Sequence, residues 1–566
     1  MTTTGTWHSY HLFLHSTTED TDAFLTEEAA GLLDGLVASG QAAKWFFIRY
    51  GEGGPHLRIR VAGLSPSVAA ELPSTLARAA KAVPSVGGPW PSHHGEVRVV
   101  EYVPETRRYG GPRALPTAED VFVVSSRVAV AALRALRRQP AGGSGRLVLA
   151  ADLAHATAYA LGMDRVTAAK WLRGHAAGWR WVTEVPLLPA AAVHMRVNAV
   201  YAAQRSALNR RAASLWEGLA EGGAGVGVGE AWLVEWADRV RAADATLRAR
   251  TESASADVDA ALRWVWASQL HMLLNRLGVS PDEERAVCRL AARTLLDTDE
   301  PVSYFPQGHR APDWQYLERS QIRIGRNEDS ALRQAPSDAA ARTDGPETPL
   351  PADPLPEVSL SAALAARSSA RGEIGGPLDA GTLGALLWNS LAESSRTRRR
   401  FADGSDRIYT HRPYPSAGAL HTARVRLLVL DVAGLPAATY DCVPESRTLR
   451  RVGPAPEKAE VEALSTYFSR PEEDPDRIGV DGAPVVAGLY VELGLLRRRY
   501  GLRALRLGLL ETGHLAQTLL LTAAALGLAG TPLGGFHDDL AHELLGLDDM
   551  DQPLQYLLPL GRRTDG

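Results

Sequence analysis

The sequence predicts an α+β protein of two domains joined by a linker. The chain has 566 residues, which is more than a single hydrophobic core usually serves. Both halves mix strand patterns with amphipathic helix patterns. Residues 331–357 are rich in Pro, Ala and Asp and carry almost no large apolar side chains. We therefore expect domains at residues 1–330 and 358–566, with a semi-extended linker between them.

Composition narrows the class of protein. Hydrophobic residues make up 45% and charged residues 22% of the chain, which is typical of a soluble globular protein. A net charge of −4 argues against a nucleic-acid partner held by a global basic field. The two cysteines, Cys288 and Cys442, form no CxxC pair, so neither a disulfide framework nor a metal site is expected. Residues 1–20 do not resemble a signal peptide, and the apolar run 515–530 is too short to span a membrane, so we expect a cytoplasmic protein.

The elements follow from hydrophobic periodicity. In the first part, alternation predicts strands at 44–50, 56–63 and 96–103, and helical spacing predicts helices at 20–39 and 257–278. In the second part, strands are expected at 425–432 and 484–493, followed by a long buried helix at 507–528. The glycine-rich stretch 221–230 lacks the Lys-Ser/Thr of a phosphate loop and is interpreted as a flexible loop.

The strand GPHLRIR, residues 54–60, places an unusual set of side chains on one face. Leu57 and Ile59 point to one side, whereas His56, Arg58 and Arg60 point to the other. The two guanidiniums lie about 7 Å apart on that face. Arginine pairs on strands are often solvated or ion-paired, so this pattern alone does not define a site.

Two more stretches of the first part carry polar groups. EYVPETRRYGG, residues 101–111, contains Glu105 and Arg108. In QLHMLLNRLG, His271 and Asn275 are one helical turn apart and share a face. Taken singly, each stretch suits a structural role, and a similar His-Met-x-x-Asn pattern recurs at 194–198.

Three motifs follow one another along the first part, in the order WFFIRY…GPHLRIR, Y-x-x-E-x-x-RYGG and HMxxNR. In this order they resemble the C-terminal domain of lantibiotic dehydratases, and the resemblance spans most of residues 5–320. The resemblance implies removal of glutamate from a glutamylated Ser or Thr of a precursor peptide, which leaves a dehydroamino acid. Arg58, Arg60 and Arg108 would hold the carboxylates of the leaving glutamate. His271 would move the Cα proton and Glu105 would orient an arginine or the imidazole, although the identity of the base stays open.

The second part contains three motifs suited to a cofactor. Arg367, Ser369 and Arg371 form R-x-S-x-R, a spacing that suits a phosphate. Pro415-Ser416-Ala417-Gly418 predicts a tight turn with exposed backbone donors. TPLGGF, residues 531–536, offers paired glycines where a backbone could approach a ligand closely.

The combination PSAGAL…YG-x-R…ETGHLAQ…LGLAGTPLGGF resembles the nitroreductase-like flavin fold over about residues 360–563, and more closely the azoline dehydrogenases. The resemblance implies bound FMN, and a homodimer with the flavin at its interface. Tyr500 would take the azoline ring proton, while Arg499 stands where the family has Lys and could act only electrostatically. The residues implied in FMN binding are Arg367, Ser369, Arg371, Ser416, Gly418, Gly534, Gly535 and Arg563.

Together the two parts resemble the bifunctional proteins of lactazole-type thiopeptide pathways. The expected partners are a ribosomally made precursor peptide and a separate glutamylating enzyme, with no direct nucleic-acid or membrane contact. Three alternatives remain open: a pyridine-forming cycloaddition enzyme, a non-catalytic module whose arginines bind an acidic leader peptide, and a generic flavin reductase.

Overall fold

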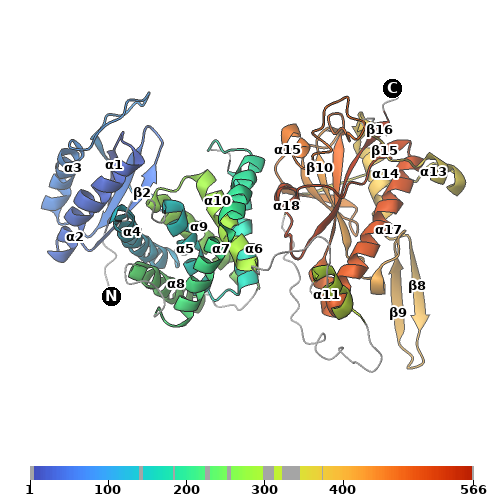
Figure 1. Cartoon of the computed structure of the whole chain (residues 1–566), viewed down its shortest axis with the longest axis horizontal. Helices are drawn as coiled ribbons and strands as arrows, with labels where there is room; N and C mark the ends of the chain where they lie inside the picture. The colour runs from blue at the N-terminus through green and yellow to red at the C-terminus, as the bar shows by residue number, and fades with distance from the viewer. Residues whose placement is uncertain are drawn as a thin grey trace. The chain divides into compact units, whose positions relative to one another are not determined.

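The computed structural model describes residues 6–138, 145–182, 185–223, 230–250, 256–297, 311–321, 345–371 and 374–563. The chain divides into two compact units (Figure 1). The first unit contains Met1–Trp179 and Met195–Asp299, and the second contains Arg180–His194 and Glu300–Gly566. Each unit combines helices with antiparallel sheet, so the predicted α+β class is confirmed.

The first unit is built on a four-stranded antiparallel sheet of described residues, in the order β2-β3-β1-β4. All three strands expected in this region are present. The strands are β1 (Trp7–Phe13), β2 (Lys44–Tyr50), β3 (His56–Ala62) and β4 (Val97–Val100). Strand β3 lies between β1 and β2, so the GPHLRIR residues occupy the middle of the sheet.

The predicted alternation along β3 is confirmed. Leu57, Ile59 and Val61 are buried in a hydrophobic cluster with the helices that cover one face of the sheet. These helices are α1 (Thr18–Ala23), a π-helical turn (Phe24–Ala29), α2 (Ala30–Ala38) and α3 (Pro66–Ala80). His56, Arg58 and Arg60 therefore project from the opposite face.

A helical layer completes the first unit and has its own core around Trp236 and Trp266. The expected helix at 257–278 is found as α9 (Ala256–Leu277). The other helices are α4 (Leu115–Arg138), α5 (Arg146–Ala160), α6 (Arg165–Gly178), α7 (Ala190–Ala220), α8 (Ala231–Ala249) and α10 (Pro281–Leu296), and a 3-10 turn runs from Trp179 to Trp181. Of these, the start of α7 up to His194 and the turn from Arg180 on group with the second unit. Helix α9 is fixed to the edge of the sheet because the Asn275 amide bonds both the backbone N–H (2.9 Å) and the backbone carbonyl (3.0 Å) of Arg49 on β2.

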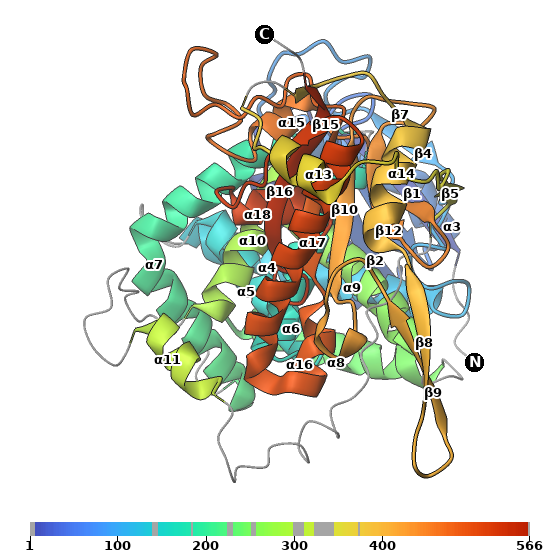
Figure 2. The ribbon, with the colours of Figure 1, turned by 90° about the vertical axis from the view of Figure 1, so that its right-hand side faces the viewer.

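The second unit is built on an eight-stranded sheet of described residues, in the order β15-β16-β14-β10-β12-β13-β5, with β6 beside β16. The long helix α17 (Ala504–Ala525) packs against it through Leu515, Leu519 and Ala523 (Figure 2). The strands are β5 (Glu347–Pro349), β6 (Ile374–Gly375), β7 (Leu378–Asp379), β8 (Ser395–Arg400), β9 (Asp406–His411), β10 (Ala423–Val429), β11 (Val432–Ala433), β12 (Ala438–Val443), β13 (Thr448–Gly453), β14 (Val485–Val491), β15 (Leu528–Gly530) and β16 (Leu554–Arg563). The remaining helices are α11 (Pro312–Arg319), α13 (Leu360–Ala366), α14 (Ala380–Leu391), α15 (Lys458–Glu462), α16 (Leu493–Tyr500) and α18 (Asp538–Leu545), with 3-10 turns at Ala417–Ala419 and Gly501–Arg503.

The boundary between the units differs from the expected one. Residues 312–319 fall within the expected first domain, but they form α11, which groups with the second unit, where the Tyr316 hydroxyl donates to the carbonyl of Leu502 at 3.1 Å. The end of the expected linker is also ordered, since β5 pairs with β13 at the edge of the sheet. Two expected segments lie largely outside the described residues. They are the linker up to residue 344 and most of the glycine-rich stretch 221–230.

Two absences concern the described residues only. No helix among them is long and apolar enough to cross a bilayer. Cys288 and Cys442 are both buried and free, and burial raises the pKa of each thiol well above its ordinary value.

Candidate functional site

Arg58 and Arg60 lie on the sheet face opposite the helical layer α1–α3, among aromatic side chains. The Arg58 guanidinium stacks 3.4 Å above the ring of Tyr50, and its Nε donates to His56 Nε2 at 3.1 Å. Arg60 is half-buried, 4.9 Å from the ring of Tyr102, and its Nε has no hydrogen-bond partner among the described residues. Burial lowers the pKa of Arg60. Contacts with aromatic rings therefore hold both guanidiniums in place, and they leave the positive charge of Arg60 uncompensated.

Arg276 adds a buried guanidinium beside Arg60. It belongs to the HMxxNR motif on α9 but was not predicted as a site residue. Its side chain is fully buried, and only Nε is hydrogen-bonded, to the Ser126 hydroxyl at 3.1 Å. Both terminal nitrogens have no partner among the described residues. The pKa of Arg276 is lowered to about 9, mainly by burial and in part by the charge of Arg60.

The two arginines meet on Phe46 of β2. The Arg60 guanidinium carbon lies 5.5 Å and that of Arg276 5.9 Å from the centroid of the Phe46 ring. No carboxylate is ion-paired with either side chain among the described residues. The charge of Arg60 lowers the pKa of Arg276, so the two like charges interact, and their partial removal from water favours a bound anion.

The RYGG turn brings Arg108 and Glu105 to the same region. Arg108 Nη1 lies 3.0 Å from Glu105; the Glu105 side chain is exposed and that of Arg108 is half-buried. Tyr109 is buried against Phe122, and its pKa is raised to about 12 by burial. The turn needs glycine because Gly110 and Gly111 adopt φ values of 85° and 89°. Tyr109 therefore anchors the turn, while Arg108 stays at its rim.

His271 is not brought into contact with these arginines. Its Nδ1 lies 2.8 Å from the Glu284 carboxylate on α10, and its ring packs edge-on against Trp179 at 5.0 Å. The same carboxylate lies 2.6 Å from His175 Nε2 on α6. Burial alone would raise the pKa of Glu284, but the charge of His271 and the hydrogen bonds from both imidazoles hold it well below its usual range. On α9, His271 and Arg276 are about 7.5 Å apart along the axis and on different sides of the helix.

His11 is a second imidazole that was not predicted. It lies on β1 directly opposite Arg58, and its ring stacks on that of His56 at 5.0 Å. Burial lowers the pKa of His11 to about 4, with further contributions from Arg58, His56, Arg60 and Arg98. His11 is therefore neutral at physiological pH and can accept a proton at the arginine face.

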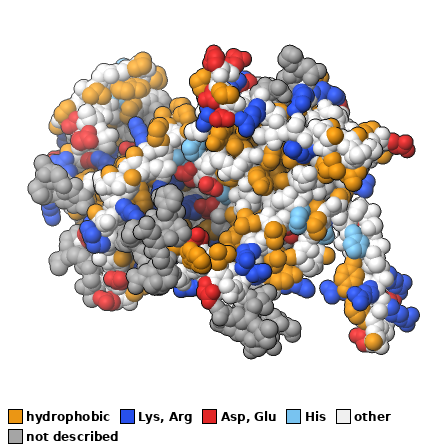
Figure 3. Space-filling model, turned by 45° about the vertical axis from the view of Figure 1, so that its right-hand side comes forward, with side chains coloured by type: hydrophobic (Ala, Val, Ile, Leu, Met, Phe, Trp, Pro, Cys, Tyr) orange, Lys and Arg blue, Asp and Glu red, His pale blue; other side chains and the backbone are white. Residues whose placement is uncertain are grey.

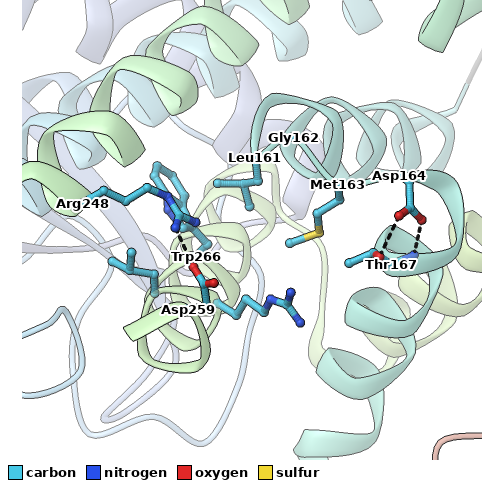
Figure 4. Close-up of a pocket in the computed structure, with 10 residues that line it drawn as sticks. Leu161, Gly162, Met163, Asp164, Thr167, Arg248, Asp259 and Trp266 are labelled. Carbon is cyan, nitrogen blue, oxygen red and sulfur yellow. Dashed lines mark hydrogen bonds and ion pairs between the residues drawn. The ribbon is translucent and has the colours of Figure 1, made fainter. Parts of the chain in front are cut away.

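A cavity of about 320 Å³ lies elsewhere in the first unit (Figure 4). It is lined by the turn between α5 and α6, with Asp164 and Thr167, and by α8 and α9, with Arg248, Asp259 and Trp266. Arg248 is ion-paired with Asp244 and Asp259 at 2.6 and 2.5 Å. None of the candidate residues lines this cavity.

In the second unit, three predicted residues meet at one loop. A Cβ added to Gly418 would lie 2.5 Å from the Tyr500 hydroxyl and 3.4 Å from Arg499 Nε. Gly418 has φ +62°, and Tyr500 packs against the same loop through Ala417 and Leu420. The Ser416 hydroxyl donates to the buried Glu511 carboxylate on α17 at 2.8 Å and accepts from the His421 N–H at 2.7 Å. The loop is thus held closely against Tyr500.

The other predicted residues gather beside β15 and the end of β16. Ser369 forms a parallel bridge with Gly530, and Arg563 Nη2 donates to the Ser368 hydroxyl at 2.7 Å. Arg367 is half-buried at the end of α13. Arg371 points instead to Asp476, with which it forms an exposed ion pair at 2.8 Å. Gly534 and Gly535 follow β15, and the Gly535 carbonyl accepts from the Ser465 hydroxyl at 2.5 Å.

The chemistry of these two sets can be compared with what a flavin nucleotide needs. Arg367, Ser369 and Arg563 provide cationic and hydroxyl donors suited to a phosphate. At the loop, the Tyr500 hydroxyl fills the space that a side chain at position 418 would need, so Gly418 lets this phenol lie directly against the backbone. Arg371 fits less well, because it has a carboxylate partner.

Comparisons with known proteins agree with the division into two units. Residues 7–295, just over half of the chain, match the family model described as lantibiotic biosynthesis dehydratase C-term. Residues 364–562 match the nitroreductase family model. Among solved structures, the pyridine synthase TbtD from thiomuracin biosynthesis is 22% identical, with a TM-score of 0.42, and the match covers 51% of this chain and 97% of TbtD.

Two curated relatives each match about a quarter of the chain. A Methanocaldococcus jannaschii protein described as a nitroreductase, MJ1384, is 29% identical over 27% of this chain and 70% of its own length. The microcin B17-processing protein McbC of Escherichia coli is 32% identical over 24% of this chain. The chain spans about half of McbC, 49% of its length. The chain therefore belongs to the lantibiotic dehydratase C-terminal family and carries a nitroreductase-family domain fused behind it.

Proposed function

We propose that the chain is a bifunctional peptide-modifying enzyme. Its first unit eliminates glutamate from glutamylated Ser or Thr of a precursor peptide, and its second unit oxidises thiazolines or oxazolines to azoles. A separate enzyme of the same pathway supplies the glutamyl group. The observation that carries the first activity is the pair Arg60 and Arg276, two buried or half-buried guanidiniums without a carboxylate partner among the described residues.

In the elimination, the base removes the Cα proton and the Cβ–O ester bond breaks, so that glutamate leaves as a carboxylate. Arg58, Arg60 and Arg108 are accessible from solvent and bind the carboxylates of the leaving group. Arg276 lies behind them and keeps the local potential positive, which stabilises the negative charge that develops on the ester oxygen.

Two imidazoles compete for the role of base. His271 is oriented by the buried Glu284, which suits a group that gains a proton during the reaction. His11 is neutral and lies within the arginine face itself. We assign the proton transfer to His271 on the basis of its motif and its Glu284 partner, since the structure does not bring it to the arginine face, and keep His11 as the alternative. Replacing each by Gln in turn distinguishes them, because only the base should change the pH dependence of kcat.

In the second unit, Tyr500 takes the ring proton of the azoline, and Ser416, Gly418, Gly534 and Gly535 line the flavin. Arg367, Ser369 and Arg563 hold the phosphate of FMN. Bound FMN would supply the two-electron acceptor that azoline oxidation requires. Exposed leucines at positions 502, 509 and 510, on and next to α17, suit a second copy of the chain at a homodimer interface.

Intact-mass spectrometry tests both activities at once. One model peptide with a glutamylated Ser and a thiazoline is incubated with the chain and FMN. Loss of glutamate and of two hydrogens supports two active sites. Retention of glutamate with loss of two hydrogens would reduce the first unit to a binding module or a different enzyme, while turnover of nitroaromatics alone would indicate a generic reductase.

A further inference from the structure

The hairpin β8–β9 of the second unit is an exposed arm that packs on little of its own unit. All six residues of β8 and the first three of β9 are exposed, including Ile408 at 64%. None of the hydrophobic clusters of described residues includes a hairpin residue. Figures 1 and 2 show the two strands projecting beyond the larger sheet of the unit. A two-stranded hairpin of this kind is marginally stable in water unless something packs on it.

The arm is strongly basic. Residues 395–411 contain five arginines, Arg396, Arg398, Arg399, Arg400 and Arg407, against two acidic residues, Asp403 and Asp406. The chain as a whole has a net charge of −4, so the arm has the opposite sign. Figure 3 shows Lys and Arg side chains gathered on this projection.

The two faces of the arm differ in how the arginines are compensated. On one face, Arg396 is ion-paired with Glu393 and Arg398 with Asp406, and Arg400 lies directly opposite Asp406 across the strands. On the other face, Arg399 lies directly opposite Arg407 across the strands, and neither has a carboxylate partner among the described residues. Like charges directly opposite each other destabilise a strand pair, and a bound anion would remove that cost. We call the side chains of Thr397, Arg399, Arg407 and Tyr409 the uncompensated face.

Aromatic rings next to these arginines complete the surface. Arg407 lies 5.3 Å from the ring of Tyr409, and Arg399 lies 5.8 Å from that of Phe401. Each strand of the two-stranded sheet also leaves one backbone edge unpaired among the described residues. An unpaired edge accepts an additional extended strand through backbone hydrogen bonds, and side chains at every second position then face the same side.

We propose that the β8–β9 arm binds an extended peptide segment that carries acidic side chains at alternate positions, with the uncompensated face pairing those carboxylates. The inference rests on the proposed function in one respect, since the occupant is taken to be an acidic segment of the precursor peptide. The arm offers an unpaired backbone edge and only a short stretch of positive charge. These features suit a peptide strand better than a nucleic acid, whose backbone requires a longer basic track.

Fluorescence anisotropy of the full chain tests the proposal without turnover. The probe is a labelled peptide with Glu at every second position, compared with the same peptide carrying Gln. We expect binding of the Glu peptide that weakens with salt, and a loss of about tenfold or more in affinity in the double variant Arg399→Glu/Arg407→Glu. The control variant Arg400→Glu makes one such charge change on the other face and should alter affinity by less than about 1.5-fold, well below the roughly threefold per charge change expected for the double variant.

The outcomes separate this inference from the proposed function. Binding without azoline oxidation would contradict the proposed function and leave the arm as a peptide site. Equal loss per charge change in Arg400→Glu and in the double variant would overturn the assignment to the uncompensated face. Tighter binding of single-stranded DNA than of the Glu peptide would overturn the peptide proposal in favour of a nucleic-acid partner.

Discussion

Two buried arginines, one in each unit, differ in what surrounds them. Arg426 on β10 donates to the carbonyls of Leu545 and Gly546 at 2.7 and 3.1 Å and is ion-paired with Asp441 at 3.3 Å. Its pKa is raised, because the effects of Tyr490 and Asp441 outweigh the opposing effect of burial. Arg276 on α9 has one hydroxyl partner, and burial lowers its pKa to about 9.

The difference teaches how to separate a structural arginine from a functional one. Arg426 joins β10 to the end of α18 and its charge is neutralised within the fold. Arg276 and its neighbour Arg60 carry charge that the described residues do not neutralise. A buried charge without a partner destabilises a fold, and such charges are typical of sites where an anion binds. The comparison between the two arginines can therefore be tested through stability and through activity.

The largest expected effect is on stability. Arg426→Met should lower the free energy of unfolding of the second unit by about 3 kcal/mol, because Asp441 and two carbonyls lose their partner. Arg276→Met should leave the stability of the first unit unchanged or raise it, because a buried charge is replaced by an apolar side chain. Calorimetry of both variants checks this. Arg371→Met, which breaks an exposed pair, is the control and should cost at most about 1 kcal/mol.

Arg60→Met should reduce elimination by about a hundredfold, because it removes a donor aimed at the developing carboxylate. Glutamate release from a glutamylated peptide is the measurement, and the melting temperature should not fall. The matched control is Arg98→Met on the same face of the sheet, since Arg98 is exposed and already paired with Glu96. A similar loss in both variants would mean that only the overall positive potential matters.

Glu284→Gln should reduce elimination by about tenfold, because His271 loses the carboxylate that orients it. The pKa of Glu284 is held below its usual range, so its pairing stabilises the fold above about pH 4.3 and this contribution is lost progressively as the pH falls further. The wild-type first unit should therefore lose stability below that pH more steeply than the variant. Parallel melting curves for the two proteins would contradict this role.

The smallest expected effect is the contribution of His11 to the pH dependence of stability. Its pKa is about 4 in the folded protein, below the ordinary value of about 6.5, so the unfolded chain binds more protons between these values. Stability should fall as the pH decreases from about 6.5 to about 4, and His11→Gln should make that decline shallower. Bound glutamate should raise the His11 pKa, which an imidazole NMR titration would detect. An unchanged titration with glutamate would place the anion elsewhere.

Much of the arginine face was predictable from sequence. Alternation in HLRIR gave the correct face for His56, Arg58 and Arg60, because a strand has only two sides. His11 was not predictable, since its place opposite Arg58 depends on the antiparallel register of β1 and β3. Arg276 was missed because α9 is apolar around much of its circumference, and the motif HMxxNR does not show which polar residue turns inward.

In the second unit, too, part of the arrangement could not be predicted from the sequence. The motifs at Ser416–Gly418 and around Tyr500 are far apart in sequence, yet the structure places Gly418 against the Tyr500 hydroxyl. The grouping of α11 and β5 with this unit was not expected, because the Pro- and Asp-rich composition around β5 is typical of a linker. Pairing with β13 overrides that composition at residues 347–349.

Binding of free glutamate tests the central claim most directly, because glutamate is the proposed product and needs no partner enzyme. The measurement is the melting temperature of the first unit with increasing glutamate, in the wild-type chain and in Arg60→Met and Arg276→Met. We predict a concentration-dependent rise in the wild type that is lost in Arg60→Met and reduced in Arg276→Met. An equal rise in all three proteins, or no rise in the wild type, would contradict the assignment of these two arginines to an anion site.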